Sequence, residues 1–96
     1  MPAWLVIDLE ATTDEGGWPL EEMEIIEIGA VLVTCGGEEI SQWQHFVRPI
    51  RHPQLTDFCR QLTQIEQYQL NNAAGFAQAS QALDEWLASQ TRTVLG

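Results

Sequence analysis

The sequence predicts an α/β domain in which three strands come first, three helices follow, and a fourth strand begins near the end. Two observations lead to this prediction. The first half holds three apolar or alternating segments separated by turn residues, and after Pro49 the apolar residues recur at helical spacing. A chain of 96 residues with 45% hydrophobic and 19% charged residues has the size and composition of one small globular domain.

Three segments have the pattern of strands. Ala3–Ile7 is a continuous apolar run, which we expect to be a strand buried on both faces. Glu24–Thr34 is the second strand, with Glu27 as a charged residue among apolar ones. A Cys-Gly-Gly turn then leads into Glu38–Arg48, whose residues alternate in polarity. The second and third strands are therefore predicted to form a hairpin.

Three helices are predicted after these strands. The first has its apolar residues at positions i, i+3, i+4 and i+7, which are Leu55, Phe58, Cys59 and Leu62. Thr63 to Glu66 fits a capping box, with Thr63 as the N-cap of a brief second helix that ends at Leu70. Gly75–Gln90 is the longest helical pattern. Thr93–Leu95 then has the pattern of a fourth strand, which a right-handed crossover would place parallel to and beside the first.

The net charge is strongly negative. Fourteen acidic residues oppose four basic ones, and the formal net charge is −10. Nucleic-acid binding usually depends on Lys and Arg, so the composition argues against a general nucleic-acid-binding protein. Divalent cations bound to a carboxylate cluster would reverse this charge locally, which leaves a metal-dependent enzyme compatible with the composition.

The two cysteines and the N-terminal residues indicate the cellular compartment in which the protein is expected. Cys35 and Cys59 lie far apart and form no C-x-x-C motif, so we interpret them as reduced thiols. The first apolar run ends at Asp8 and is too short for a signal peptide or a membrane span. We expect a cytoplasmic protein without membrane association, and the sequence does not indicate its oligomeric state.

Asp8 and Glu10 are the candidate catalytic and metal-binding residues. They lie two positions apart where the first strand ends, so their side chains would point to the same side. Two neighbouring carboxylates repel each other unless a cation lies between them, and Mg²⁺ is commonly held by one or two carboxylates plus phosphate oxygens. The pair is half of a two-metal phosphodiesterase site. On this spacing alone, a strand end that simply leads into a loop is the alternative.

A family resemblance favours the metal site over the simple strand end. Val6–Thr12 (VIDLEAT) resembles the first motif of the DEDDh 3′–5′ exonucleases, an apolar strand followed by D-x-E-x-T. Glu24–Leu32, Phe46–Pro49 and Leu62–Ile65 are similar to later elements of that family in order and spacing. Pro53–Cys59 is most similar to the branch that contains the small-RNA and histone-mRNA 3′ exoribonucleases. The resemblance covers nearly the whole chain.

The resemblance implies an RNase H-like fold with a mixed sheet of order β-β-β-α-α-α-β, and hydrolysis from the single-stranded 3′ end of RNA or DNA. It implies that Asp8 bridges two Mg²⁺ or Mn²⁺ ions. Glu10 would bind the nucleophile-side ion and help to position the attacking water. Four residues would border the terminal nucleotide: Leu9, Ala11, Thr12 and Thr63.

Several family features have no counterpart in these residues. The second motif would supply another metal-binding Asp, and the third a His general base and a final Asp; nothing in residues 1–96 matches either. His45 and His52 precede the helices and are not expected to be that base. We therefore interpret residues 1–96 as the N-terminal portion of a single exonuclease domain, truncated in the fourth strand and inactive alone.

Other interpretations stay open at this stage. The chain is alternatively a non-catalytic acidic binding module that keeps the front half of the fold, or a small acidic mimic of nucleic acid. Glu27 is either a partner of the metal-binding carboxylates or a solvent-facing residue. Trp18, in the loop after the first motif, is a candidate for stacking on a base.

Overall fold

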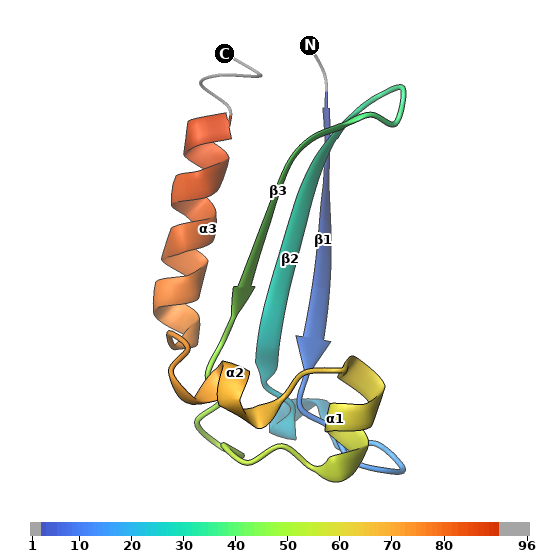
Figure 1. Ribbon diagram of the computed structural model, residues 1–96, viewed down its shortest axis with the longest axis vertical. Coiled ribbons are helices and arrows are strands. Elements are labelled where there is room, and N and C mark those ends of the chain that lie inside the picture. The colour runs from blue at the N-terminus through green and yellow to red at the C-terminus, as the bar shows by residue number, and fades with distance from the viewer. Residues whose placement is uncertain (1–2, 91–96) are drawn as a thin grey trace.

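A computed structural model describes residues 3–90, which form a three-stranded antiparallel sheet with helices at one end and along one side (Figure 1). The strands are β1 (Ala3–Ala11), β2 (Ile25–Thr34) and β3 (Glu39–Phe46), in the order β1-β2-β3. The predicted meander and the β2–β3 hairpin are confirmed. β1 is longer than expected and includes the D-x-E residues, whereas β3 ends before the predicted Arg48.

The helices lie at two places around this sheet. A short 3-10 helix, η1 (Leu20–Glu22), lies in the connection between β1 and β2. The helices α1 (Asp57–Thr63) and α2 (Gln67–Asn71) cross one end of the sheet, and α3 (Phe76–Gln90) runs alongside β3 (Figure 1). None of the helices in this described part has the length and apolarity needed to cross a membrane. The predicted fourth strand, residues 93–95, lies outside the described residues.

Strand register determines which side chains lie beside one another. In the β1–β2 ladder Asp8 is opposite Gly29 and Glu10 is opposite Glu27. In the β2–β3 ladder Gly29 is opposite Gln44. The β1–β2 register shifts directly after Glu10, so the alternation of faces is interrupted at the end of the D-x-E segment.

The core consists of two clusters of buried side chains. One joins the end of the sheet to α1 and α2, and is formed by Ile26, Cys59, Ile65 and Leu70, with Phe46 and Leu55 packed against it. The other joins the sheet to α3, and is formed by Ile28, Val47 and Ala79, with Ile25, Trp43 and Leu83 packed against it. Complete burial of an aliphatic side chain of this size contributes about 1.5–3 kcal/mol, so these clusters hold the helices on the sheet.

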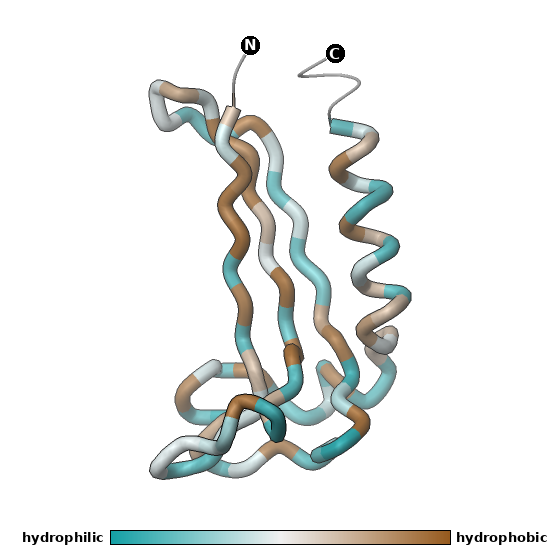
Figure 2. Tube along the Cα trace, turned by 180° about the vertical axis from the view of Figure 1, so that it is seen from behind, coloured by the Kyte–Doolittle hydropathy of each residue, from teal (hydrophilic) through white to brown (hydrophobic). Residues whose placement is uncertain are grey.

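The prediction that the first strand is buried on both faces is wrong for the described residues. Five apolar side chains of β1 are between 41% and 64% exposed, namely Trp4, Leu5, Val6, Ile7 and Leu9. Figure 2 shows this strand as a hydrophobic run that hydrophilic residues interrupt toward its end. The physical reason is position, because β1 is at the edge of the described sheet and has a neighbour only on the β2 side.

The prediction that Thr63 caps the second helix is also wrong. Thr63 is the last residue of α1, and its Oγ1 donates to the Cys59 carbonyl at 2.8 Å. The capping box of α2 begins three residues later, where Glu66 is the N-cap and its N–H donates to Gln69 Oε1 at 2.8 Å. Two overlapping cap patterns occur here. The preceding helix, α1, is capped by Thr56 and includes Thr63 in its last turn, so Thr63 is not free to cap α2.

Candidate active site

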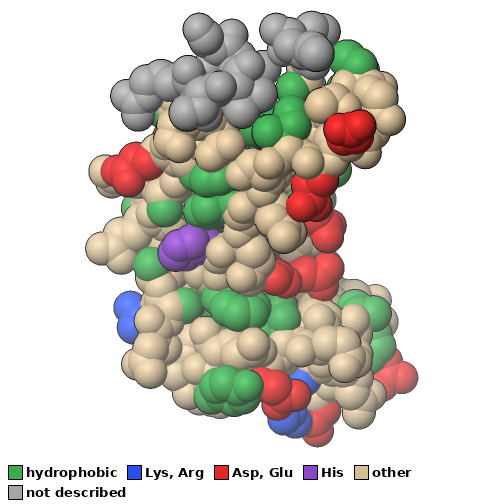
Figure 3. Space-filling view, turned by 45° about the horizontal axis from the view of Figure 1, so that its top comes forward, with side chains coloured by type: hydrophobic (Ala, Val, Ile, Leu, Met, Phe, Trp, Pro, Cys, Tyr) green, Lys and Arg blue, Asp and Glu red, His purple; other side chains and the backbone are tan. Residues whose placement is uncertain are grey.

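The Asp8 and Glu10 side chains lie on the same face of β1, as the two-residue period of a strand requires. Asp8 is exposed and Glu10 is half-buried. Gly29, opposite Asp8, adds no side chain to this face; a Cβ there would lie 3.7 Å from the Asp8 carbonyl oxygen. In Figure 3 acidic side chains gather along the side of the sheet away from α3. This face therefore offers two carboxylates with open space beside them.

The pKa of Glu10 depends on its burial and on the two acidic side chains near it. Its pKa is raised, first by desolvation, and then by the negative charges of Asp8 and Glu27. A divalent cation would relieve this repulsion, and hard carboxylate oxygens are the donors that Mg²⁺ and Mn²⁺ prefer. The two residues thus fit the metal that the sequence analysis implies. Within residues 3–90, no three His, Cys, Asp or Glu side chains converge as a metal-holding group.

Glu27 lies on the same face as the carboxylate pair. It is directly opposite Glu10, and its Oε2 accepts a hydrogen bond of 2.8 Å from Gln44 Nε2 on β3. Of the two interpretations that the sequence left open, the structure favours the one in which Glu27 is a partner of the candidate carboxylates, because it lies opposite Glu10. Its position depends on strand register, which links residues far apart in the chain.

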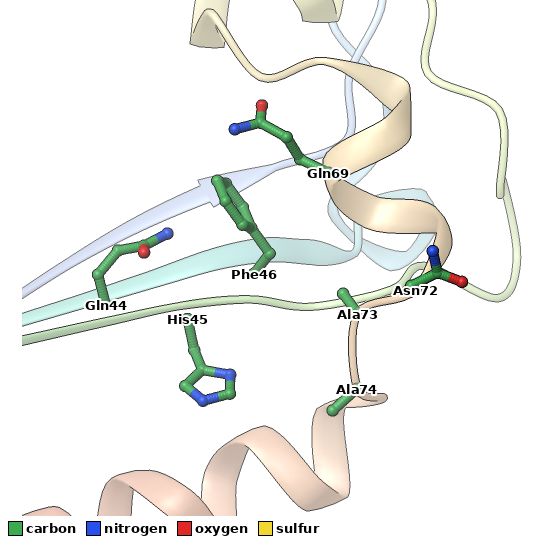
Figure 4. Close-up of a pocket in the computed structure, with 7 residues that line it drawn as sticks. All are labelled: Gln44, His45, Phe46, Gln69, Asn72, Ala73 and Ala74. Atoms are coloured by element: carbon green, nitrogen blue, oxygen red, sulfur yellow. The ribbon is translucent and has the colours of Figure 1, made fainter.

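A hollow of about 370 Å³ lies at the edge of β3, next to this face. Its walls come from β3, from α2 and from the α2–α3 connection: Gln44, His45, Phe46, Gln69, Asn72, Ala73 and Ala74. Figure 4 shows Gln44 and Phe46 on the side of β3 that faces Gln69, while His45 points to the other side, toward α3. Gln44 therefore borders the hollow and also contacts Glu27.

The residues after the D-x-E pair are held by hydrogen bonds. Thr12 is 2% exposed; its Oγ1 accepts from Glu24 N at 2.9 Å, and its own N–H donates to the Glu24 carbonyl at 2.8 Å. The Ala11 carbonyl accepts from Cys59 Sγ at 3.7 Å. By strand alternation, the Leu9 side chain lies on the opposite face from Glu10, the face that α3 packs against. The immediate role of these contacts is to fix the backbone around Glu10.

The sequence does not reveal a carboxylate clamp at Glu24. Its two oxygens accept the backbone N–H groups of Ile50 and Arg51 at 2.8 Å and of His52 at 2.9 Å. Desolvation acts to raise the pKa of Glu24, but the three N–H donors outweigh it and the pKa is lowered. Because Glu24 also bonds Thr12, the clamp joins the end of β1, the start of β2 and the segment before α1. Backbone donors leave no pattern in a sequence, so no signal was present.

Trp18 and the two histidines have partners within the protein. The Trp18 ring lies 4.5 Å from the His52 ring, between centroids, at a tilt of 43°. His52 Nε2 is 3.3 Å from Glu22 Oε2, and the pKa of Glu22 is lowered by hydrogen bonds from His52 and Arg51. His45 stacks on Trp43 with centroids 5.0 Å apart. These contacts hold the rings in place, and stacking of Trp18 on a base stays a prediction.

Thr63 and Gln64 lie between α1 and α2. Thr63 is half-buried, and besides its bond to Cys59 its Oγ1 accepts from Ile65 N at 3.2 Å. Gln64 has a φ of +64°, in the left-handed region, at the position where the similar exonuclease motif L-T-G-I has glycine. The backbone therefore keeps the turn that glycine would make there, and a side chain is added.

A meander with a D-x-E pair on its first strand, followed by helices that pack on one end and one side, is the arrangement expected for the N-terminal part of an RNase H-like domain. The family model described as Exonuclease (RNase_T) matches residues 5–95. The chain belongs to this exonuclease family.

The relatives specify the branch. Human 3′–5′ exoribonuclease 1 is 41% identical over 83 residues, which are 85% of this chain and 24% of the relative. Human ERI1 exoribonuclease 3 is 36% identical over 88 residues, 91% of this chain and 26% of the relative. The chain thus spans about a quarter of these curated relatives, at 24% and 26% of their lengths.

Solved structures agree with this placement. The nuclease domain of 3′hExo, described as a DEDDh family member bound to rAMP, matches with a TM-score of 0.86 and 37% identity, over 92% of this chain and 44% of that one. A full-length 3′-exonuclease matches with a TM-score of 0.87 and 36% identity, over 92% and 29%. The DEDDh resemblance and the RNase H-like fold class predicted from the sequence are confirmed.

Proposed function

We propose that this chain forms part of a metal-dependent exonuclease that removes nucleotides from the single-stranded 3′ end of RNA or DNA. The observation that carries the proposal is the placement of Asp8 and Glu10 side by side on β1, in a chain that belongs to the exonuclease family. RNA is the favoured substrate because the relatives are named exoribonucleases, and one similar structure is described as 3′-end recognition of a histone mRNA stem-loop.

In this proposal Asp8 and Glu10 hold Mg²⁺ or Mn²⁺. Bound ions supply Lewis-acid activation of water and neutralise charge on the scissile phosphate in a two-metal mechanism. Asp8 is exposed and Glu10 is half-buried. Both carboxylates would hold the ions, and Glu10 would also help to position the attacking water. Glu10 needs its ionised form for this role, and a cation would lower its raised pKa toward the usual range.

The proposed border of the terminal nucleotide consists of Leu9, Ala11, Thr12 and Thr63. Thr12 supports this border indirectly, because its hydroxyl is engaged with Glu24 and its side chain is 2% exposed. Ala11 and Thr63 are both linked to Cys59, through Cys59 Sγ and the Cys59 carbonyl, so the end of β1 and the end of α1 meet at one place. We propose that this junction is the floor under the last nucleotide.

We further propose that residues 1–96 alone have activity near background. They contain Asp8 and Glu10 but no match to the second and third exonuclease motifs, which would complete the metal site and supply a general base. The alternative is a non-catalytic acidic binding module with the same fold, which the net charge of −10 favours. A module of that kind would not trim nucleic acid at all, so loss of the Asp8 charge would change nothing in a trimming assay.

The test compares Asp8→Asn with Glu21→Gln in a longer version of the protein that continues its reading frame. Glu21 is exposed in η1 and serves as a matched control for the loss of one acidic charge. With 5′-end-labelled RNA and Mn²⁺, Asp8→Asn should lose at least about 10²-fold in trimming rate, the scale of a lost transition-state electrostatic contact. Glu21→Gln should retain nearly full activity, and equal losses in the two variants would refute the site.

A further inference from the structure

Glu27 is a charged residue within a strand that is otherwise uncharged, β2 (Ile25–Thr34). It lies directly opposite Glu10 in the antiparallel β1–β2 ladder. Side chains opposed in this way have Cβ atoms about 5 Å apart, and two like charges there destabilise the sheet. The fold therefore accepts an unfavourable pair of carboxylates beside the proposed metal ligands.

The charge of Glu27 is not required by its hydrogen bonding. Its single described side-chain partner is Gln44, whose Nε2 donates to Glu27 Oε2 at 2.8 Å. The carbonyl oxygen of a glutamine at position 27 would accept the same hydrogen bond without repelling Glu10. A residue that keeps a destabilising charge, where a neutral residue of the same shape would fit, points to a role for that charge.

The surroundings direct this charge toward β1. Gln44 holds one oxygen of Glu27 from the β3 side, and Glu10 lies directly opposite Glu27 on the β1 side. Gly29 lies between Asp8 and Gln44 in the register and places no side chain in that space. Within residues 3–90 the carboxylates of Asp8, Glu10 and Glu27 do not converge as a three-ligand group.

We propose that Glu27, anchored by Gln44, is a positioning residue of the metal site: its charge holds the Glu10 carboxylate toward Asp8 and increases the affinity for divalent cations. This inference rests on the proposed function, because it concerns the metal that Asp8 and Glu10 hold. Glu27 acts through Glu10 and contacts neither the ion nor the substrate. If Glu27 had only a structural role, removal of its charge would lower the stability of the metal-free protein. In this proposal, removal of the charge raises that stability.

The experiment measures Mn²⁺ affinity by calorimetric titration and metal-free unfolding temperature on the chain, with far-UV circular dichroism to verify folding. Glu27→Gln should weaken Mn²⁺ binding about tenfold, the lower end of the range for residues that support metal ligands. It should also unfold at a slightly higher temperature in chelator, because the repulsion of Glu10 is removed. Glu39→Gln, which removes the same charge from an exposed position at the start of β3, should change the affinity by less than about twofold.

The anchoring residue provides a second variant. Gln44→Ala removes the hydrogen bond that anchors Glu27 but leaves its charge, so it should weaken Mn²⁺ binding less than Glu27→Gln does. Combined with Glu27→Gln it should add nothing, because in this proposal Gln44 affects the metal site only through the charge of Glu27. Wild-type affinity in Glu27→Gln, together with lost binding in Asp8→Asn, would overturn the inference and leave the proposed function intact. Complete loss of binding in Glu27→Gln would also overturn it, because Glu27 would then be a ligand. Equal binding by wild type and Asp8→Asn would refute the metal site itself.

Discussion

Removal of the Glu24 carboxylate should destabilise the protein more than its half-exposed position suggests. Glu24→Ala leaves the backbone N–H groups of Ile50, Arg51 and His52 without their acceptor. Hydrogen bonds to a charged group contribute about 1.5–3 kcal/mol each when buried. Water can reach these groups in part, so we assign about 1 kcal/mol to each and expect a loss of about 3 kcal/mol, equivalent to about 15 °C in Tm for a domain of this size.

Two variants calibrate this value. Glu24→Gln keeps a carbonyl oxygen that can replace Oε1, which accepts from Arg51 and His52, so it should lose about half as much as Glu24→Ala. Glu21→Ala, in the same loop but exposed, should stay within about 0.5 kcal/mol of wild type. Urea unfolding monitored by tryptophan fluorescence is a suitable assay, because Trp18 packs on His52 beside the clamp.

The pH dependence provides an independent check. The pKa of Glu24 is lowered from its usual value of 4.5, so the clamp contributes fully above about pH 4.5 and its contribution is lost as pH falls through the folded-state pKa. The difference in stability between wild type and Glu24→Ala should therefore be constant from pH 7 to about pH 5 and should narrow below that. Equal urea midpoints at pH 7, or a difference that persists unchanged at pH 2.5, would refute the reasoning.

Three further predictions concern the fold. Gln64→Gly should raise stability by about 0.5–1 kcal/mol, because Gln64 has a φ of +64° that costs an L-residue about 1 kcal/mol; a lower denaturation midpoint would contradict this. Leu70→Ala, at a fully buried position, should cost about 2–4 kcal/mol in thermal or urea unfolding, and a loss below 1 kcal/mol would mean that α2 is not packed as described. Cys35 is exposed, whereas Cys59 is buried and its pKa is raised. A thiol reagent should therefore label Cys35 in the native protein and Cys59 only after unfolding. Equal labelling rates for the two thiols would argue against the packing of α1 on the sheet.

Strand identity and the carboxylate pair could be predicted from the sequence because both depend on local periodicity. The D-x-E spacing places Asp8 and Glu10 on one face whatever their neighbours are, and the alternation in Glu38–Arg48 identifies a strand. The burial of β1 could not be predicted in the same way. A continuous apolar run such as Ala3–Ile7 shows what a strand tolerates on its two faces, but it does not show what covers them.

Other features depend on tertiary contacts that local patterns do not contain. Thr63 and Glu66 form a plausible capping box, but Glu66 and Gln69 form a second one, and the choice depends on where α1 packs. The Glu24 clamp involves backbone donors near residue 51, which any sequence has. The Glu27–Gln44 hydrogen bond spans 17 positions and follows from the register of the hairpin.

The measurement that tests the central claim most directly is a degradation assay with 5′- and 3′-end-labelled single-stranded RNA and DNA, in Mn²⁺ and in chelator. It compares the 96-residue chain with a version that continues along its reading frame. The account predicts that only the longer protein trims, only from the 3′ end and only with metal. If neither protein trims under any condition, Asp8 and Glu10 are not catalytic, and the acidic binding module becomes the better description.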